Sequence, residues 1–168
     1  MFTNPPPQAL RALLKDAKTI AVVGISPRPE RPSHRIAARL LEWGYRVIPV
    51  RPAISEVLGL KAYASLSDVP ERIDLVDVFR NPEDAGSIVD ECIALKLPAV
   101  WLQEGVVNEP AAARALAAGM TVVMDRCISV EYRKLLARRS RSPNCTARAT
   151  ISSCSTRLRV PSGSPARS

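Results

Sequence analysis

The sequence predicts an α/β fold built on one parallel sheet, and two of its features carry this prediction. Five short runs of aliphatic residues alternate with longer segments in which apolar residues recur at helical spacing. Such alternation is typical of βαβ units, whose strands run parallel with right-handed crossovers. The runs are also almost continuously apolar, as in strands that are covered on both faces. We therefore expect a Rossmann-like, doubly wound, five-stranded parallel sheet with helices on both faces.

In the first half of the chain, glycine, serine and proline residues mark where the elements begin and end. The first strand is expected to end at Gly24, and Ser33 can cap the helix that follows. Gly44 is placed to end that helix in the left-handed conformation, and Pro52 stops the second strand. The expected elements are a helix over 8–17, a strand over 19–23, a helix over 33–43 and a strand over 45–50.

The second half repeats the pattern of a strand followed by a helix. Asn81 and Pro82 suit the cap and the first position of a helix, and Asn108 begins a helix that ends near Gly119. The expected elements are strands over 73–79, 99–102 and 121–124 and helices over 82–95, 108–119 and 129–137.

The length and composition indicate one soluble globular domain. The chain has 168 residues, of which 46% are hydrophobic and 24% are charged. No apolar run approaches the ~20 residues that span a bilayer, and residues 1–10 lack the basic and then apolar pattern of a secretory signal. We therefore expect a cytoplasmic protein with no membrane partner.

The positive charge is concentrated at the C-terminus. The net charge is +8, but residues 138–168 hold seven Arg and no acidic residue, which leaves 17 basic and 16 acidic residues elsewhere. A nucleic-acid-binding domain usually has a basic stripe on a folded face, so this distribution argues against nucleic acid as a partner. Residues 139–168 also lack any sustained apolar period. We expect a domain over 1–138 and a disordered Arg/Ser/Pro-rich tail over 139–168.

The sequence offers few candidates for metal binding or catalysis. Its four cysteines lack CxxC spacing and its only histidine is His34, so no metal site is expected. For His34, a phosphate contact or simple exposure is favoured over general-base chemistry. Asp77 is interpreted as a structural carboxylate within a strand, and Cys92 as a small core residue. We identify no catalytic residue and predict that the chain is not an enzyme.

A ligand is expected beyond the carboxyl ends of the parallel strands, where the strand order reverses. The first of these segments, 24–33, is not a GxGxxG fingerprint, but free N–H groups at the start of a helix attract phosphate. Ser26 and Ser33 can add hydroxyl donors, and Arg28 and Arg31 can add charge. A solvated loop is the alternative. The other segments selected in this way are 49–52, 78–81, 103–106 and 125–128.

The residue after the second strand discriminates between classes of nucleotide. An NAD-binding domain usually has an acidic residue there, which holds the ribose hydroxyls, whereas this chain has Arg51. An arginine suits a phosphorylated ribose, as in NADP or in the 3′-phospho-ADP part of coenzyme A. An exposed arginine without a ligand is the alternative, and NAD becomes the least favoured dinucleotide.

Several motifs occur in order between residues 8 and 138: VGIS at 23–26, RPS at 31–33, GYRVIPV at 44–50, VDVFR at 76–80, WLQEG at 101–105 and DRCI at 125–128. Together they resemble the coenzyme A-binding domain family of small bacterial proteins. That family is similar in fold to the coenzyme A-binding domain of the succinyl-CoA synthetase alpha subunit. Its members commonly carry Val-Asn-Pro where this chain has Val50-Arg51-Pro52.

The resemblance implies that coenzyme A, or an acyl-CoA, lies across the strand ends. The implied contacts are Gly24, Ile25, Ser26, Arg31 and Ser33 at the phosphates, Val50, Arg51 and Pro52 at the adenosine, Val78, Phe79 and Arg80 at the nucleotide or the pantetheine arm, and Gln103, Glu104 and Gly105 on the far side.

Cys127 is a candidate reactive thiol. It precedes the last predicted helix, whose N-terminus can lower a thiol pKa, and Arg126 adds positive charge. A mixed disulfide with coenzyme A and a redox switch are two hypotheses for this residue. A buried small residue is the alternative that we favour.

The leading functional hypothesis is a non-catalytic binding or sensor module for coenzyme A or an acyl-CoA, with a homodimer or a protein partner left open. The alternative is an NADP-binding oxidoreductase or a redox sensor. The missing GxGxxG and the lack of a catalytic Tyr-Lys pair argue against this alternative. A third hypothesis is a scaffold whose Arg-rich tail binds an acidic partner.

Overall fold

The computed structural model describes residues 1–137, so the predicted disordered tail over 139–168 lies outside the described residues. Five parallel strands form one sheet in the order β2-β1-β5-β6-β7, which confirms the predicted α/β sheet. The strands are β1 (Thr19–Val23), β2 (Arg46–Val50), β5 (Leu75–Val78), β6 (Ala99–Leu102) and β7 (Thr121–Val123).

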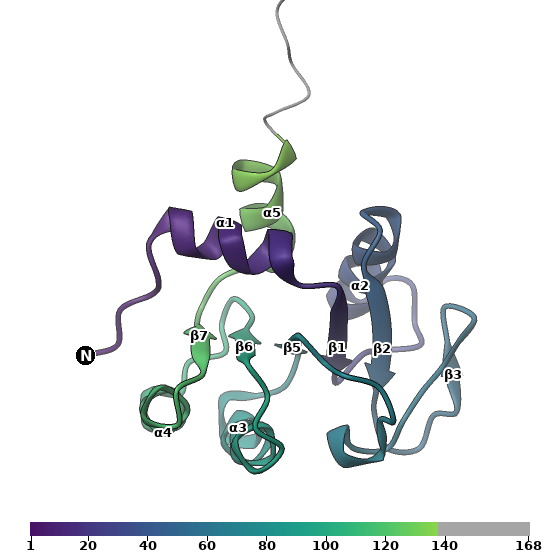
Figure 1. Cartoon of the computed structure of the whole chain (residues 1–168). Coiled ribbons are helices and arrows are strands. Elements are labelled where there is room, and N and C mark those ends of the chain that lie inside the picture. Colours follow the sequence, from purple (N-terminus) through teal and green to yellow (C-terminus); the bar gives the residue numbers. More distant parts are fainter. Residues whose placement is uncertain (138–168) are drawn as a thin grey trace, which may run out of the picture.

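Helices cover both faces of this sheet (Figure 1). One face is covered by α1 (Pro7–Asp16), α2 (Pro32–Glu42) and α5 (Ile128–Leu135), and the other by α3 (Pro82–Ala94) and α4 (Glu109–Ala117). The sheet is thus the middle of three layers, as its continuously apolar strands predict. Within residues 1–137, no helix is both long and apolar enough to cross a membrane.

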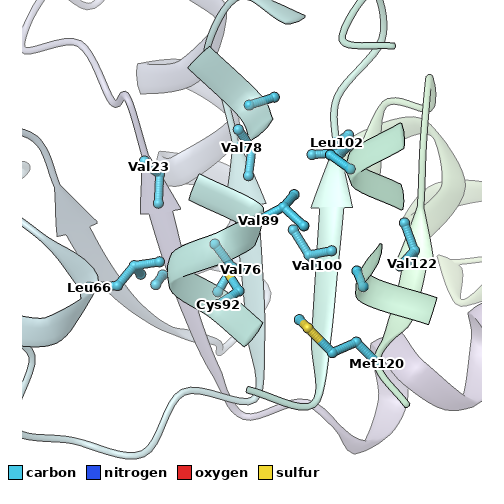
Figure 2. Packing of buried hydrophobic residues seen from close by; sticks show 14 of the residues in the cluster. Val23, Leu66, Val76, Val78, Val89, Cys92, Val100, Leu102, Met120 and Val122 are labelled. Atoms are coloured by element: carbon cyan, nitrogen blue, oxygen red, sulfur yellow. The ribbon is translucent and has the colours of Figure 1, made fainter. Parts of the chain in front are cut away.

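Successive strand residues supply two separate cores, because their side chains point to opposite faces of the sheet. Leu75 of β5 packs toward α1, α2 and α5, whereas Val76 and Val78 pack toward α3 and α4. Figure 2 shows the second core, where Val89 and Cys92 of α3 lie against the strands. Cys92 is 0% exposed, which confirms the prediction of a core residue, and this burial raises the pKa of its thiol to about 12. Burying a Val or Leu side chain contributes about 1.5–3 kcal/mol, so the two cores together hold the strand ends firmly in place.

The strand order reverses between β1 and β5. The chain passes from β1 through α2 to β2 on one side, and β5 then pairs with the other side of β1. Val23 of β1 lies in register between Val50 and Val78, so the carboxyl ends of three strands are level. The loops that leave these ends meet at a switch point, which is where open α/β sheets bind ligands.

The starts of α2 and α4 differ in how they are capped. Ser33 does not cap α2 as predicted: Arg31 is the N-cap residue, and Pro32 takes the first helical position. Proline suits that position because its missing N–H would have no partner there, so the helix begins just before Ser33. Asn108 does cap α4, since its Oδ1 accepts a hydrogen bond from the Ala111 N–H at 3.0 Å.

Between β2 and β5 the chain forms a small hairpin that the sequence pattern does not predict. β3 (Glu56–Val57) pairs antiparallel with β4 (Leu60–Lys61), and a 3-10 helix (Leu66–Asp68) follows. The two-residue turn has positive φ at Leu58 (55°) and Gly59 (70°). Turns of this kind usually carry Asn-Gly or Asp-Gly, so Leu-Gly gives little signal in the sequence.

Candidate functional site

A cavity of about 910 Å³ lies at the carboxyl ends of the strands, where the topology predicts a ligand. It is lined by the loop after β1, the first turn of α2, and the segments that follow β2, β5 and β6. The predicted cofactor contacts that line it are Gly24, Ser26, Arg31, Ser33, Arg51, Phe79, Arg80, Gln103 and Glu104. The fold therefore brings most of the predicted residues together, and their contact with a ligand stays a prediction.

The remaining predicted contacts lie outside this lining. Ile25, Val50 and Val78 are at most 2% exposed and belong to the two cores, so they can reach a ligand only through their backbone. Pro52 lines a smaller cavity of about 300 Å³. Gly105 is exposed in the loop after β6, with φ of 83°.

Gly24 is the point where the end of β1 approaches the end of β5. Its φ is 82°, and a Cβ added to it would lie 2.4 Å from the carbonyl oxygen of Phe79. Its N–H donates to the carbonyl of Val50 at 2.9 Å. A side chain is therefore excluded here by both space and conformation, and the loop can bring its backbone close to a ligand.

The loop after β1 is fastened to the first turn of α2. The Ser26 N–H donates to Ser33 Oγ at 3.0 Å, and Ser26 Oγ accepts from the Arg28 N–H at 3.2 Å. His34 Nδ1 lies 3.0 Å from the Ser26 carbonyl oxygen, and because a carbonyl only accepts, this nitrogen carries the proton. Ser33 can still donate its own hydroxyl proton to a ligand. His34 holds the loop, and its side chain does not line the cavity.

Four arginines give the cavity a strongly cationic side: Arg28, Arg31, Arg51 and Arg80. None of them forms an ion pair among the salt bridges of the described residues. Arg51 is positioned by a hydrogen bond from its Nη1 to the carbonyl of Ile25 at 3.1 Å. Two carboxylates, Asp84 and Glu104, also line the cavity. Four unpaired guanidinium groups against two carboxylates favour an anionic ligand.

The N-terminus of α2 adds to this anion preference. No side chain caps the helix, which leaves N–H groups of its first turn without an intrahelical partner. These groups and the positive end of the helix dipole attract phosphate. Arg31 and Ser33 stand at this same helix start and both line the cavity.

Gln103 lines the cavity but directs its polar atoms into the protein. The side chain is 4% exposed. Its Nε2 donates to Asp77 Oδ1 at 2.6 Å, and its Oε1 accepts from the Ile128 N–H at 3.4 Å. Burial raises the pKa of the Asp77 carboxyl from 3.8 to about 7. Both ends of the amide are engaged, so a polar contact between Gln103 and a ligand would compete with existing bonds.

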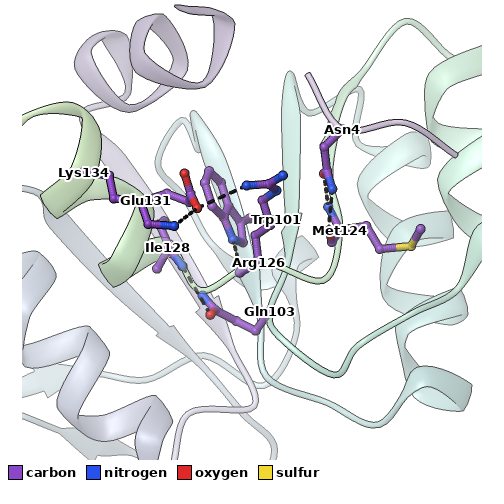
Figure 3. Close-up of polar contacts among 8 residues, drawn as sticks. All are labelled: Asn4, Trp101, Gln103, Met124, Arg126, Ile128, Glu131 and Lys134. Carbon is purple, nitrogen blue, oxygen red and sulfur yellow. Dashed lines mark hydrogen bonds and ion pairs between the residues drawn. The ribbon is translucent and has the colours of Figure 1, made fainter. Parts of the chain in front are cut away.

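Cys127 lines the same cavity. Its neighbour Arg126 is held against β6 by Trp101 (Figure 3). Trp101 Nε1 donates to the Arg126 carbonyl at 2.6 Å, and the Arg126 guanidinium pairs with Glu131 at 3.2 Å. The positive charge of Arg126 is thus shared with a carboxylate. Cys127 is the N-cap residue of α5 and is half-buried. The resemblance assigns no ligand contact to Cys127, although its segment, 125–128, follows the carboxyl end of a strand, where a ligand is expected.

The arrangement suits a ligand that is anionic at one end and less polar elsewhere. Phe79 and Val106 add apolar surface to the cationic side. In the part of the chain that is described, no group of three or more His, Cys, Asp or Glu side chains is arranged to hold a metal ion. The cavity is therefore suited to phosphate recognition by arginines, hydroxyls and backbone N–H groups.

Comparison with known proteins agrees with this geometry. The family described as "CoA binding domain" matches residues 18–133. Protein YneT of Bacillus subtilis is 41% identical over 129 residues, which cover 77% of this chain and 96% of YneT. A solved structure from Thermus thermophilus has a TM-score of 0.75 at 43% identity and covers 78% of this chain and 99% of that one. ADP-forming acetate–CoA ligase I of Archaeoglobus fulgidus is 31% identical over 75 residues, or 45% of this chain and 11% of the ligase. The chain belongs to the CoA-binding domain family.

Proposed function

We propose that this protein binds coenzyme A or an acyl-CoA through the 3′-phospho-ADP part and acts as a non-catalytic binding or sensor module. The observation that carries the proposal is the set of four unpaired arginines around one cavity at the switch point of the sheet. Coenzyme A has a pyrophosphate and a 3′-phosphate, which suit several guanidinium groups and a helix N-terminus. The cavity volume of about 910 Å³ lies within the range of small-molecule sites.

The absence of catalysis is part of this proposal. His34 is the only histidine of the chain, and its Nδ1 is bonded to the Ser26 carbonyl. The segment shared with the acetate–CoA ligase makes up 11% of that enzyme, so ligase activity is not assigned to this chain. The cavity supports the binding of coenzyme A, and we assign no catalytic step to it.

The alternative is an NADP-binding oxidoreductase or a redox sensor. Arg51 lines the cavity and suits a 2′-phosphate as well as a 3′-phosphate, and Cys127 offers a thiol on the same cavity. Four ligands separate the two functions. Calorimetric titration of the full chain with coenzyme A, dephospho-coenzyme A, NADP and NAD is therefore the first experiment.

Coenzyme A is expected to bind with the highest affinity of the four, and loss of its 3′-phosphate is expected to weaken binding about tenfold or more. The reason is that hydrogen bonds to charged groups contribute about 1.5–3 kcal/mol. Binding of NADP without coenzyme A would replace the proposal by the oxidoreductase or redox sensor. If none of the four ligands binds, both the coenzyme A proposal and the NADP alternative are contradicted. The scaffold hypothesis would then remain.

Arg31→Ala and Arg51→Ala are each expected to lower the affinity for coenzyme A about 10- to 100-fold, because each removes charged donors from the cavity. The effect should shrink as salt rises, since salt screens attraction between charges. Arg35→Ala is the matched control, because Arg35 is an exposed arginine on α2 that does not line the cavity. An equal loss of affinity in the Arg35 variant would show that only the general charge of the protein matters.

A further inference from the structure

Asp77 is a buried carboxylate behind the cavity. It lies on β5 with 0% exposure, opposite Val22 of β1 and Trp101 of β6. Its Oδ1 accepts the bond from Gln103 Nε2 at 2.6 Å. Its Oδ2 is the one buried side-chain oxygen or nitrogen that finds no hydrogen-bond partner among the described residues. A buried polar atom without a partner is costly, so this group calls for an explanation.

Gln103 links Asp77 to the start of α5. Its Oε1 accepts from the N–H of Ile128 at 3.4 Å, the first residue of α5, whose N–H has no partner inside the helix. Figure 3 shows this contact beside the Trp101–Arg126 bond. Cys127 directly precedes Ile128 and lines the cavity. A chain of two hydrogen bonds therefore runs from the carboxylate in the sheet to residues 127–128. We call this segment, of which Cys127 lines the cavity, the Cys127 wall.

The strength of the bond between Asp77 and Gln103 depends on the charge of Asp77. An ionised carboxylate only accepts hydrogen bonds, so it holds Nε2 toward itself and leaves Oε1 for the Ile128 N–H. Such a charge-assisted bond is roughly twice as strong as a neutral one. A protonated Asp77 can carry its proton on Oδ2, which has no partner among the described residues, and then accepts from Nε2 only as a neutral group. Ionisation of Asp77 thus strengthens the contact that anchors α5.

We propose that Asp77, acting through Gln103, is a positioning residue for the Cys127 wall, so that its ionisation and nucleotide binding in the cavity are coupled. This inference rests on the proposed function for its ligand but not for the internal contact. Coupling is reciprocal: an ionised Asp77 favours binding, and a bound nucleotide favours the ionised Asp77. Burial, which raises the pKa of Asp77 to about 7, places the transition close to neutral pH.

Other ionisable groups lie on the helices that cover this face of the sheet, and the experiment has to separate them. Glu131 is the buried one, and it pairs with Arg126 and Lys134. His34 bonds the Ser26 carbonyl. The remaining charged or titratable side chains of α1, α2 and α5 and of the described residues within three positions of either end of each are Arg11, Lys15, Asp16, Lys18, Glu30, Arg31, Arg35, Arg39, Glu42, Tyr45, Asp125, Cys127, Tyr132 and Arg133. Within residues 1–137, none of the hydrogen bonds of these side chains ends on Asp77.

The internal contact is tested without a ligand by a pH titration of the full chain, followed by nuclear magnetic resonance of the Ile128 amide and the Gln103 side-chain amide. Both signals are expected to shift with one common midpoint in the wild type and to lose that transition in Asp77→Asn. Asp74→Asn is the matched control, because Asp74 lies just before the same strand and accepts from the Lys18 and Thr19 N–H groups. It should keep the transition. An Ile128 amide that does not titrate, or titrates equally in Asp77→Asn, overturns the inference.

The coupling to a ligand is tested with dephospho-coenzyme A, which lacks the phosphomonoester that itself titrates near pH 6. Its affinity is expected to be about threefold to tenfold higher at pH 8 than at pH 6 in the wild type and in Asp74→Asn, and nearly constant in Asp77→Asn. The same pH dependence in all three proteins overturns the coupling. If no binding is seen at any pH, the proposed function fails, and the resonance titration alone then decides on the Asp77–Gln103 contact.

Discussion

Gly24→Ala is expected to abolish detectable coenzyme A binding, which means a loss of at least about 100-fold, and to lower the free energy of unfolding by about 3 kcal/mol. Two effects combine at this position. A φ of 82° is strained for alanine by about 1–2 kcal/mol. The new Cβ would also lie 2.4 Å from the Phe79 carbonyl oxygen, so the ends of β1 and β5 must move apart. Because Arg51 and Ser26 are positioned from this junction, the cavity changes shape.

Gly119→Ala separates the two effects. Gly119 has the same φ of 82°, but nothing lies within 4 Å of an added Cβ, and it ends α4 away from the cavity. Urea denaturation should show a loss of about 1–2 kcal/mol, and calorimetry should show unchanged affinity for coenzyme A. Equal losses of stability in the two variants would mean that the close approach of β1 and β5 is not tight. Retained binding in Gly24→Ala would mean that the loop is not part of the site.

The strands and the location of the site were predictable because they depend on local pattern and on topology. The runs 19–23 and 99–102 are strands with those bounds, because short continuous aliphatic runs are typical of strands that are buried on both faces of a sheet. Arg51 reaches the cavity because it follows a strand next to the switch point. The role of Ser33 was not predictable. Pro32 takes the first helical position, so Ser33 lies inside the helix, where its hydroxyl accepts a hydrogen bond from the Ser26 N–H instead of capping the helix.

The network behind the cavity could not be derived from sequence, because it joins residues far apart in the chain. Asp77 and Gln103 are 26 positions apart, and Gln103 and Ile128 are 25 apart. Strand periodicity could place Asp77 and Gln103 on one face of the sheet, but not in contact. The resemblance assigns Gln103 to the ligand, whereas the fold shows its amide engaged with Asp77 and α5. A side chain of this kind shapes a site without the sequence revealing how.

Asp77→Asn is expected to remove most of the dependence of stability on pH between about 4 and 7. The wild-type carboxyl has a pKa of about 7 in the folded chain against an ordinary value of 3.8. Below about pH 3 the carboxyl is mostly protonated in both the folded and the unfolded chain, so its contribution to stability is constant. As pH rises, the Asp77 carboxyl ionises in the unfolded chain first and stays protonated in the folded chain. The free energy of unfolding therefore falls until pH passes about 7. At 1.36 kcal/mol per pH unit, that interval corresponds to about 4 kcal/mol.

Urea denaturation at pH 4.5 and pH 8 measures this effect. The wild type should lose about 3 kcal/mol between the two values, while Asp77→Asn should change little and be the more stable protein at pH 8. Asp74→Asn should follow the wild type. A wild type that is equally stable at both values would show that Asp77 ionises without hindrance. The expected trend opposes function: the ionised form that anchors Gln103 and α5 is the form that destabilises the sheet. A bound nucleotide that favours the ionised carboxylate would offset that cost, so the pH dependence of stability should weaken when coenzyme A is present.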